Sequence, residues 1–313
     1  MNGQSLKPIK RSGLRIYLGT KYFRLKRILE WYFTRKKYAT KMVDLPYRYP
    51  IAVHKTILRR KLKDVDMWYQ ENKIINLKIA IHKLNGIVIQ PGETFSYWKL
   101  IGHPTRRKGY TSGMILHYGT FKPGIGGGLC QLSNLIYWIT LHTSLTVTER
   151  HRHSYDVFPD ANRTQPFGSG ATCAYNYLDL QVKNNTNTPY QLWLNVTDNH
   201  LVGEWRTNIP EMMSYEIYQK DHKITHETWG GYVRHNTIYR KVFNGQNELL
   251  DDEYITENHA LMMYNPLLSH TSYDDIENHQ DYESNLNQLH RLLEDNIISE
   301  EEYQKKKEDL LNA

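Results

Sequence analysis

The sequence predicts an α+β fold, because helical and strand-like patterns occupy largely different parts of the chain. Helical periodicity dominates the first third, and another apolar helical pattern begins near residue 131. Alternating β-favouring segments, separated by Asn and Asp turns, follow from about residue 174. Helices followed by consecutive strands are typical of α+β domains with a mostly antiparallel sheet.

The N-terminal region, residues 1–45, is strongly basic, and the whole chain has a formal net charge of +7. Between Lys7 and Lys41, lysines and arginines outnumber a single acidic residue, Glu30. Apolar residues recur at helical spacing from Tyr22 to Phe33, which predicts an amphipathic helix. This helix either packs on the domain with a solvated basic face or lies on an anionic membrane surface. No nucleic-acid recognition motif accompanies the charge, so no nucleic-acid partner is expected.

The predicted central domain covers residues 46–265. A helical stretch is expected from about 54 to 84, interrupted near 64–66, and a second helix from 131 to 144. Alternating segments within 211–265 extend the same domain. The other expected strands lie at 87–89, 110–121, 145–149, 174–183, 189–197 and 200–206.

A glycine-rich stretch, Gly-Ile-Gly-Gly-Gly-Leu-Cys-Gln-Leu-Ser at residues 124–133, leads directly into the second helix. Consecutive glycines allow positive φ angles and close backbone approach, so we expect a tight turn that places Cys130 at the helix N-terminus. Unpaired amides and the helix dipole at that position favour a thiolate and should lower its pKa. The same amides are candidate donors to an oxyanion. The pattern therefore predicts a cysteine nucleophile, although a buried structural cysteine is the plain alternative.

A cysteine nucleophile needs a base, and His151 and His153 follow the helix at the far end of the 145–149 strand. A strand that returns beside the helix N-terminus would bring either histidine near Cys130. A third residue that orients the histidine could come from the next strand, where Asn176 and Asp179 are the candidates.

Three sequence blocks follow one another along the chain: Pro91–Ser96, Gly126–Ser133 and Glu149–Ser154. Together, and in this order, they resemble the VanW family. The family's His-Ser pair matches His153-Ser154, so the resemblance makes His153 the predicted base and His151 the second choice. Two positions depart from the pattern of relatives: Trp98 replaces an asparagine, and Gly170 stands where many have an aspartate.

The resemblance implies acyl transfer, because VanW domains have been linked to L,D-transpeptidation, the cysteine-dependent cross-linking of peptidoglycan stems. The expected substrate is a peptide stem or another envelope precursor, with Cys130, His153 and Asp179 as the catalytic residues. Arg150 is either a structural residue or a ligand for a substrate carboxylate. The predicted substrate and oxyanion contacts are Gly126, Gly127, Gly128, Gln131, Ser133, Arg150, His151, Glu93 and Ser96.

Two alternatives remain open at this stage. One is a zinc site formed by Cys130, His151 and His153 with His117 or Cys173, but this spacing matches no familiar zinc signature. No metal or cofactor is therefore predicted. The other alternative is a non-catalytic accessory or scaffold protein of glycopeptide resistance or envelope metabolism, which binds a precursor or a partner.

The C-terminal part is expected to be separate from the domain. Residues 266–283 resemble a polar linker, and residues 284–313 resemble the short helical hairpin known as a SHOCT domain. A hairpin of about thirty residues buries little core, so self-association or a protein partner is expected for 284–311. The chain has no apolar run of about 18 residues and no signal-peptide pattern at its start. We therefore expect a cytoplasmic protein, with the inner face of the membrane as a candidate site of contact.

Overall fold

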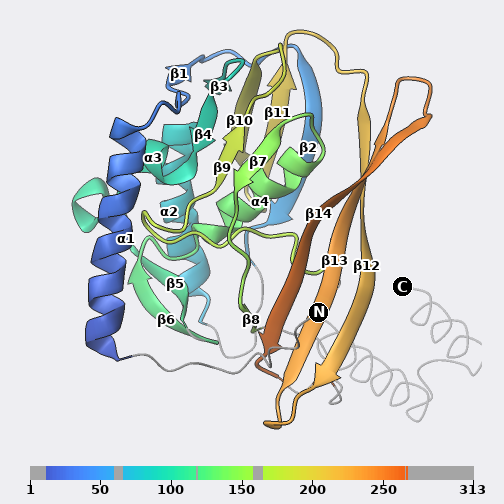
Figure 1. Ribbon diagram of the computed structural model, residues 1–313. Helices are drawn as coiled ribbons and strands as arrows, with labels where there is room; N and C mark the ends of the chain where they lie inside the picture. The colour runs from blue at the N-terminus through green and yellow to red at the C-terminus, as the bar shows by residue number, and fades with distance from the viewer. Residues whose placement is uncertain (1–11, 60–65, 118, 158–164, 265, 267–313) are drawn as a thin grey trace, which may run out of the picture. The chain divides into compact units, whose positions relative to one another are not determined.

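The computed structural model describes residues 12–59, 66–117, 119–157, 165–264 and 266 (Figure 1). These residues form helices and mostly antiparallel sheets, which confirms the predicted α+β class. The expected linker after Pro266 and the C-terminal hairpin lie outside the described residues. Among the described helices, none combines the length and the apolar character needed to cross a membrane.

A five-stranded antiparallel sheet forms the centre of the core, in the order β1-β3-β10-β11-β2. Two helices, α2 (Trp68–Leu84) and α4 (Cys130–Leu141), pack on it, and their buried side chains belong to one hydrophobic core with the fully buried Trp205 of β11. The Trp205 indole also donates a hydrogen bond to Thr140 Oγ1 of α4, at 2.9 Å. The strands are β1 (Lys41–Met42), β2 (Tyr49–Ile57), β3 (Ile87–Ile89), β10 (Tyr190–Val196) and β11 (His200–Thr207).

A smaller three-stranded sheet brings distant sequence blocks together, in the order β4-β9-β7. It consists of β4 (Thr94–Ser96), β9 (Gln181–Lys183) and β7 (Thr146–Glu149), and the short helix α3 (Tyr97–Ile101) follows β4 directly. The block that ends at Ser96 and the block that begins at Glu149 therefore lie on either side of one central strand.

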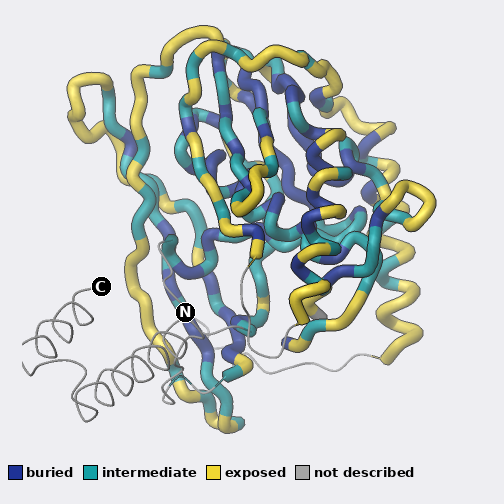
Figure 2. Tube along the Cα trace, turned by 180° about the vertical axis from the view of Figure 1, so that it is seen from behind, coloured by how far each residue is buried: buried dark blue, intermediate teal, exposed yellow. Residues whose placement is uncertain are grey.

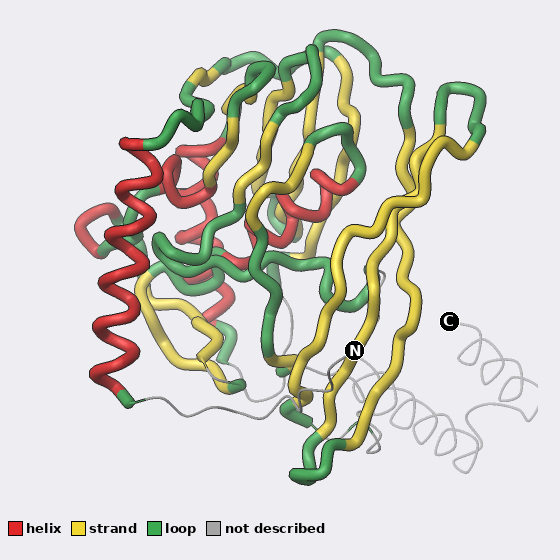
Figure 3. The backbone as a smooth tube through the Cα atoms, viewed as in Figure 1, coloured by secondary structure: helices red, strands yellow, loops and turns green. Residues whose placement is uncertain are grey.

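Two hairpin-like units complete the fold. The first is the pair β5 (Ser112–His117) and β6 (Thr120–Ile125), which leads into the glycine turn before α4. A single turn of 3-10 helix, η1 (Arg106–Lys108), precedes β5. The second is a meander of three long strands, β12 (Ser214–His226), β13 (Tyr232–Phe243) and β14 (Leu249–Met262), with the short β8 (Tyr155–Asp156) parallel to β14. Figure 3 shows this meander as the long strands beside the mixed part of the fold.

The N-terminal helix α1 (Gly13–Phe33) begins at Ser12, whose hydroxyl accepts a hydrogen bond from the Arg15 amide. Its buried residues are Arg27 and Trp31, whereas most of its large apolar side chains are exposed. The prediction of a helix at 22–33 is confirmed. Of the two arrangements that the sequence left open, the one in which the apolar face packs on the domain is wrong, because most of these apolar side chains are exposed and the inward side carries Arg27, which pairs with Glu30 and Glu149.

Several element boundaries differ from the sequence prediction. Residues 54–57 belong to strand β2, where β11 supplies a hydrogen-bonding partner along its length, and the helix starts only at Trp68. The expected strand at 110–121 is a hairpin of two strands. Only 181–183 of the expected 174–183 strand pairs in a sheet, while Ala174 and Leu178 close a local turn by exchanging two 3.0 Å backbone hydrogen bonds.

Candidate functional site

The predicted glycine turn is present, and Cys130 is the first residue of α4. Gly126 and Gly128 adopt φ angles of +76° and +88°, which residues with a side chain rarely adopt. The amides of Gly126, Gly127 and Gly128 donate hydrogen bonds of 2.9 to 3.0 Å to the carbonyls of Thr111, Gly124 and Met114. These amides thus stabilise the turn itself, and their role as oxyanion donors stays a prediction.

Close backbone contact explains the middle glycine of the turn. A Cβ on Gly127 would lie 2.1 Å from the Gly113 carbonyl carbon, and a Cβ on Gly113 would lie 2.6 Å from the Gly127 oxygen. The Asn76 side chain of α2 stabilises this close approach, because it donates a 2.9 Å hydrogen bond to the Gly127 carbonyl. The turn before Cys130 is therefore fixed by β5 on one side and α2 on the other.

The segment 171–173 lies beside the start of α4. The Cys130 thiol is 3.8 Å from the Cys173 carbonyl oxygen, and the buried Ser133 hydroxyl donates to the Ala171 oxygen at 2.7 Å. Tyr97 donates to the Leu129 carbonyl at 2.9 Å and is fully buried. Ser133, predicted as a substrate contact, thus joins two backbone segments around Cys130.

Burial raises the pKa of the Cys130 thiol, although backbone hydrogen bonds at Cys173 and at Cys130 itself oppose this effect. Burial also raises the pKa of Cys173 well above its usual value. The expectation that the helix N-terminus lowers the pKa of Cys130 is therefore wrong for this arrangement. A neutral resting thiol needs a base to become a nucleophile.

His153 is poorly suited to accept a proton. Burial, with a contribution from the neighbouring Arg150 guanidinium, lowers the pKa of His153 to about 4. No hydrogen bond joins its ring to another residue in the described part of the chain. Arg150 donates hydrogen bonds to the carbonyls of Gly168 and Gly170 and to the Asn258 side chain. Its guanidinium therefore stabilises the turn at 168–170.

His151 forms the histidine–carboxylate pair of the region. Its Nε2 lies 2.9 Å from a carboxylate oxygen of Glu149, and its backbone carbonyl accepts a 2.8 Å hydrogen bond from the Thr172 amide. The backbone of His151 and the thiol of Cys130 therefore contact adjacent residues of one segment, Thr172 and Cys173. Glu149 was not among the predicted site residues. Its spacing two residues before His151 in an extended chain is the sequence signal that could have identified it.

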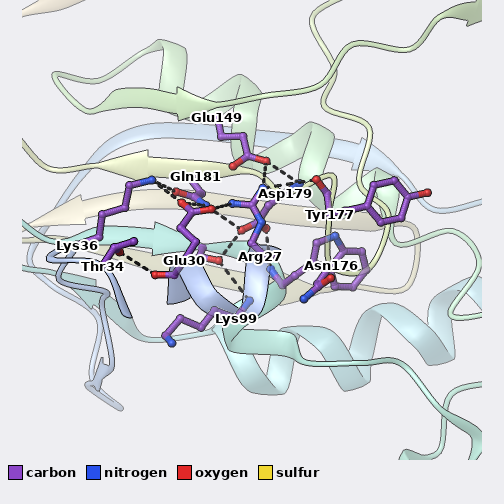
Figure 4. Close-up of polar contacts among 12 residues, drawn as sticks. Arg27, Glu30, Thr34, Lys36, Lys99, Glu149, Asn176, Tyr177, Asp179 and Gln181 are labelled. Carbon is purple, nitrogen blue, oxygen red and sulfur yellow. Dashed lines mark hydrogen bonds and ion pairs between the residues drawn. The ribbon is translucent and has the colours of Figure 1, made fainter. Parts of the chain in front are cut away.

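Glu149 belongs to a buried charged cluster that reaches into α1. Burial opposes its ionisation, but hydrogen bonds from His151 and Arg27 bring the pKa of Glu149 below its usual value. Figure 4 shows Arg27 of α1 between Glu30 and Glu149, next to Asp179 and Gln181. The Asp179 amide donates to Glu149 at 3.2 Å. Local sequence patterns do not reveal the part that Arg27 plays here, because Arg27 lies far from the three sequence blocks along the chain.

Asp179, the predicted third catalytic residue, is fully buried. Its carboxylate accepts hydrogen bonds from the Ser96 hydroxyl and, at 2.9 Å, from the Trp98 amide. Burial raises the pKa of Asp179 to about 7. Asp179 and Ser96 thus connect the first sequence block to β9, and the catalytic role of Asp179 stays a prediction.

The remaining predicted contacts point to neighbouring backbone. Gln131 donates to Thr56 Oγ1 and to the Ile57 carbonyl of β2, both at 2.9 Å, and Glu93 accepts from the Gln90 amide at 3.0 Å. A Cβ on Gly170 would lie 2.7 Å from Asn134 Oδ1, which accepts a hydrogen bond from the Ala171 amide. The Asn134 amide group therefore fills the space that an aspartate at position 170 would need.

Two buried hydroxyls lack a hydrogen-bonding partner among the described residues, those of Tyr110 and Thr172. Thr172 directly precedes Cys173. Burial raises the pKa of Tyr97 most, and the nearby Cys173, Cys130 and Tyr110 raise it further. Buried polar groups are normally paired, so these hydroxyls are candidate contacts for a ligand. Within the described ranges, no three His, Cys, Asp or Glu side chains come together as a metal site, and the zinc alternative gains no support.

Comparisons with known proteins agree with the sequence blocks. Residues 72–206 match the family described as VanW like protein, and residues 284–311 match the Short C-terminal domain, SHOCT. The chain is 35% identical over 199 residues to the vancomycin B-type resistance protein VanW of Enterococcus faecalis, across 64% of this chain and 72% of that protein. It is 31% identical over 114 residues to the uncharacterized protein YoaR of Bacillus subtilis, across 36% of either chain. No solved structure matches the chain significantly.

Proposed function

The chain belongs to the family of VanW-like proteins, and from this premise we propose that it is a cell-wall-related acyltransferase that uses Cys130 as its nucleophile. The proposed donors are peptide stems of peptidoglycan or their precursors, in an L,D-transpeptidase-like reaction. The proposed compartment is the cytoplasm. The enterococcal relative is named as a vancomycin resistance protein, and this name supports a proposed role in vancomycin resistance.

The observation that carries the proposal is that one short segment, Thr172–Cys173, contacts both the Cys130 thiol and the backbone of His151, whose ring pairs with Glu149. The Thr172–Cys173 segment contacts the thiol with its Cys173 carbonyl and His151 with its Thr172 amide. A His151 ring that donates its Nε2 proton to Glu149 keeps a lone pair on Nδ1 for the thiol proton. Glu149 then stabilises the imidazolium, as the carboxylate does in a catalytic triad.

The proposed reaction proceeds in two balanced steps. In the first, the Cys130 sulfur bonds to the peptide carbonyl carbon while His151 takes the thiol proton, and the carbon–nitrogen bond then breaks as His151 protonates the leaving amine. In the second, an acceptor amine or water attacks the thioester, His151 takes its proton, and Cys130 recovers that proton as it leaves. The Tyr110 and Thr172 hydroxyls are the proposed donors to the oxyanion.

The first experiment measures acylation of the full chain by p-nitrophenyl acetate, with peptide mass spectrometry to locate the acetyl group. We expect acetylation on Cys130, its loss in Cys130→Ser, and a rate about 10²- to 10⁴-fold lower in His151→Ala. Cys173→Ser is the matched thiol control and should leave the acetylation of Cys130 in place. A larger effect of His153→Ala than of His151→Ala would assign the base to His153 instead. Circular dichroism checks that each variant is folded.

The raised pKa of Cys130 favours a second candidate, a non-catalytic accessory protein that binds an envelope precursor or a partner. Under this candidate, Cys130 stays unacylated by the ester and by a synthetic peptide stem, and its iodoacetamide alkylation rises only at alkaline pH. Deletion of the 284–311 match would then impair function, whereas Cys130→Ser would not.

A further inference from the structure

Helix α1 presents an apolar face to solvent, on the side opposite its contacts with the domain. The residues of this face are spaced three or four positions apart, as one stripe of a helix requires. Phe33 at its end is 81% exposed and Tyr32 is 70% exposed. The stripe consists of Leu14, Leu18, Tyr22, Leu25, Leu29 and Tyr32.

The orientation of α1 is fixed by polar contacts on the inner side. Arg24 donates to the Tyr175 carbonyl at 3.0 Å, Arg27 pairs with Glu149, and Lys99 donates to the Trp31 carbonyl at 3.3 Å. Rotation of the helix to bury the stripe would expose these buried partners and break the ion pair. Figure 2 shows the consequence as the long exposed stretch along α1.

Positive charge borders the exposed stripe on both edges. By helical geometry, Lys21 lies on one edge and Arg15 and Lys26 on the other, and all three are exposed. The single acidic residue of the helix, Glu30, is already paired with Arg27 and Lys36. The face therefore offers cations without compensating acids, and it favours an anionic occupant.

We propose that α1 docks the protein on an anionic phospholipid surface, with the Leu18–Leu25–Leu29 stripe in the headgroup and acyl boundary. A helix of 21 residues extends about 30 Å in the plane of the membrane. The mixture of tyrosine, phenylalanine, leucine and lysine is typical of interfacial helices that lie on a bilayer rather than span it. A second copy of α1 fits this face less well, because its lysines and arginines would face those of the first copy.

The test is cosedimentation of the full chain with vesicles of phosphatidylcholine, with and without phosphatidylglycerol. We expect binding to the vesicles that contain phosphatidylglycerol and release by high salt. Leu18→Ser/Leu25→Ser/Leu29→Ser and Lys21→Gln/Lys26→Gln should each lower partitioning about tenfold or more. Leu249→Ser/Leu250→Ser and Lys55→Gln/Lys78→Gln, which change exposed residues elsewhere, are the matched controls and should bind like the original chain.

Three outcomes would overturn the proposal. One is no binding to vesicles of either composition. A second is binding that the α1 variants do not change. A third is a dimer in light scattering that the leucine variant dissociates, without vesicle binding, which would make the stripe an interface between copies of the chain. None of these readouts depends on Cys130, so they are independent of the proposed acyl transfer.

Discussion

Gly127 illustrates how closely the backbone around Cys130 is packed. Its carbonyl accepts from Asn76, and its Cα faces the Gly113 backbone, so no side chain fits between the turn and β5. Packing at this density resists even one added methyl group, because Gly113 belongs to β5, which pairs with β6, and Gly127 belongs to a hydrogen-bonded turn. The position of the proposed nucleophile therefore depends on the absence of a side chain at Gly127.

We predict that Gly127→Ala lowers the free energy of unfolding by about 2–4 kcal/mol. A Cβ only 2.1 Å from the Gly113 carbonyl carbon must displace the turn or β5. The control is Gly19→Ala in α1, where nothing lies within 4 Å of the added carbon and helix propensity should give a gain of up to about 1 kcal/mol. Urea unfolding followed by circular dichroism measures both, and equal effects would contradict the packing argument.

The sequence predicts part of the site and not the rest, for reasons that differ by residue. Cys130 could be placed at a helix start because a glycine turn and an apolar helical pattern are both local signals. The choice between His151 and His153 could not be made from the sequence, because the burial of His153 beside Arg150 and the hydrogen bond of His151 to Glu149 arise from tertiary contacts. The pKa of Cys130 was also beyond local reasoning, since burial by the 171–173 segment opposes the helix terminus.

At the scale of elements, α1 reverses the usual arrangement of an amphipathic helix. Periodicity correctly predicts a helix but does not decide which face packs on the domain. The inward face is selected by Glu149 and the Tyr175 carbonyl, which supply partners for Arg27 and Arg24. Strand β2 shows the same limit: residues 54–57 have helical periodicity, but pairing with β11 makes them a strand.

We predict that Arg27→Ala lowers the free energy of unfolding by about 3–5 kcal/mol, because Glu149 and Glu30 lose a buried counter-ion. Limited proteolysis should then cleave α1 faster than in the original chain. Lys26→Ala, one residue away on the exposed side, should change stability by less than about 0.5 kcal/mol. Similar protease resistance in both variants would show that the Arg27 ion pairs do not hold α1.

At the scale of the whole molecule, the fully buried Asp179 and the partly buried His153 make stability depend on pH in opposite directions. Asp179 has a folded-state pKa of about 7 against an ordinary value of 3.8, so the native state keeps a proton that the unfolded chain releases. Its contribution to stability is therefore lost as the pH rises from about 4 to 7. His153 has a folded-state pKa of about 4 against 6.5, so the unfolded chain takes up a proton that the native state refuses. Its contribution is lost as the pH falls from about 6.5 to 4.

We predict that the two effects partly cancel in the original chain and separate in single variants. Relative to the original chain, Asp179→Asn should gain on the order of 2–4 kcal/mol between about pH 4 and pH 8, because the neutral amide has no charge to bury. His153→Gln should instead gain on the order of 2–3 kcal/mol as the pH falls from about 6.5 to 4. Urea unfolding across this pH range measures how the free energy of unfolding of each variant changes with pH. A change in packing shifts the free energy equally at every pH, so it can be subtracted from the comparison. A pH-independent difference for Asp179→Asn would mean that its carboxyl group ionises in the folded protein much as it does in the unfolded chain, with Ser96, Trp98 and Arg27 balancing the cost of burial.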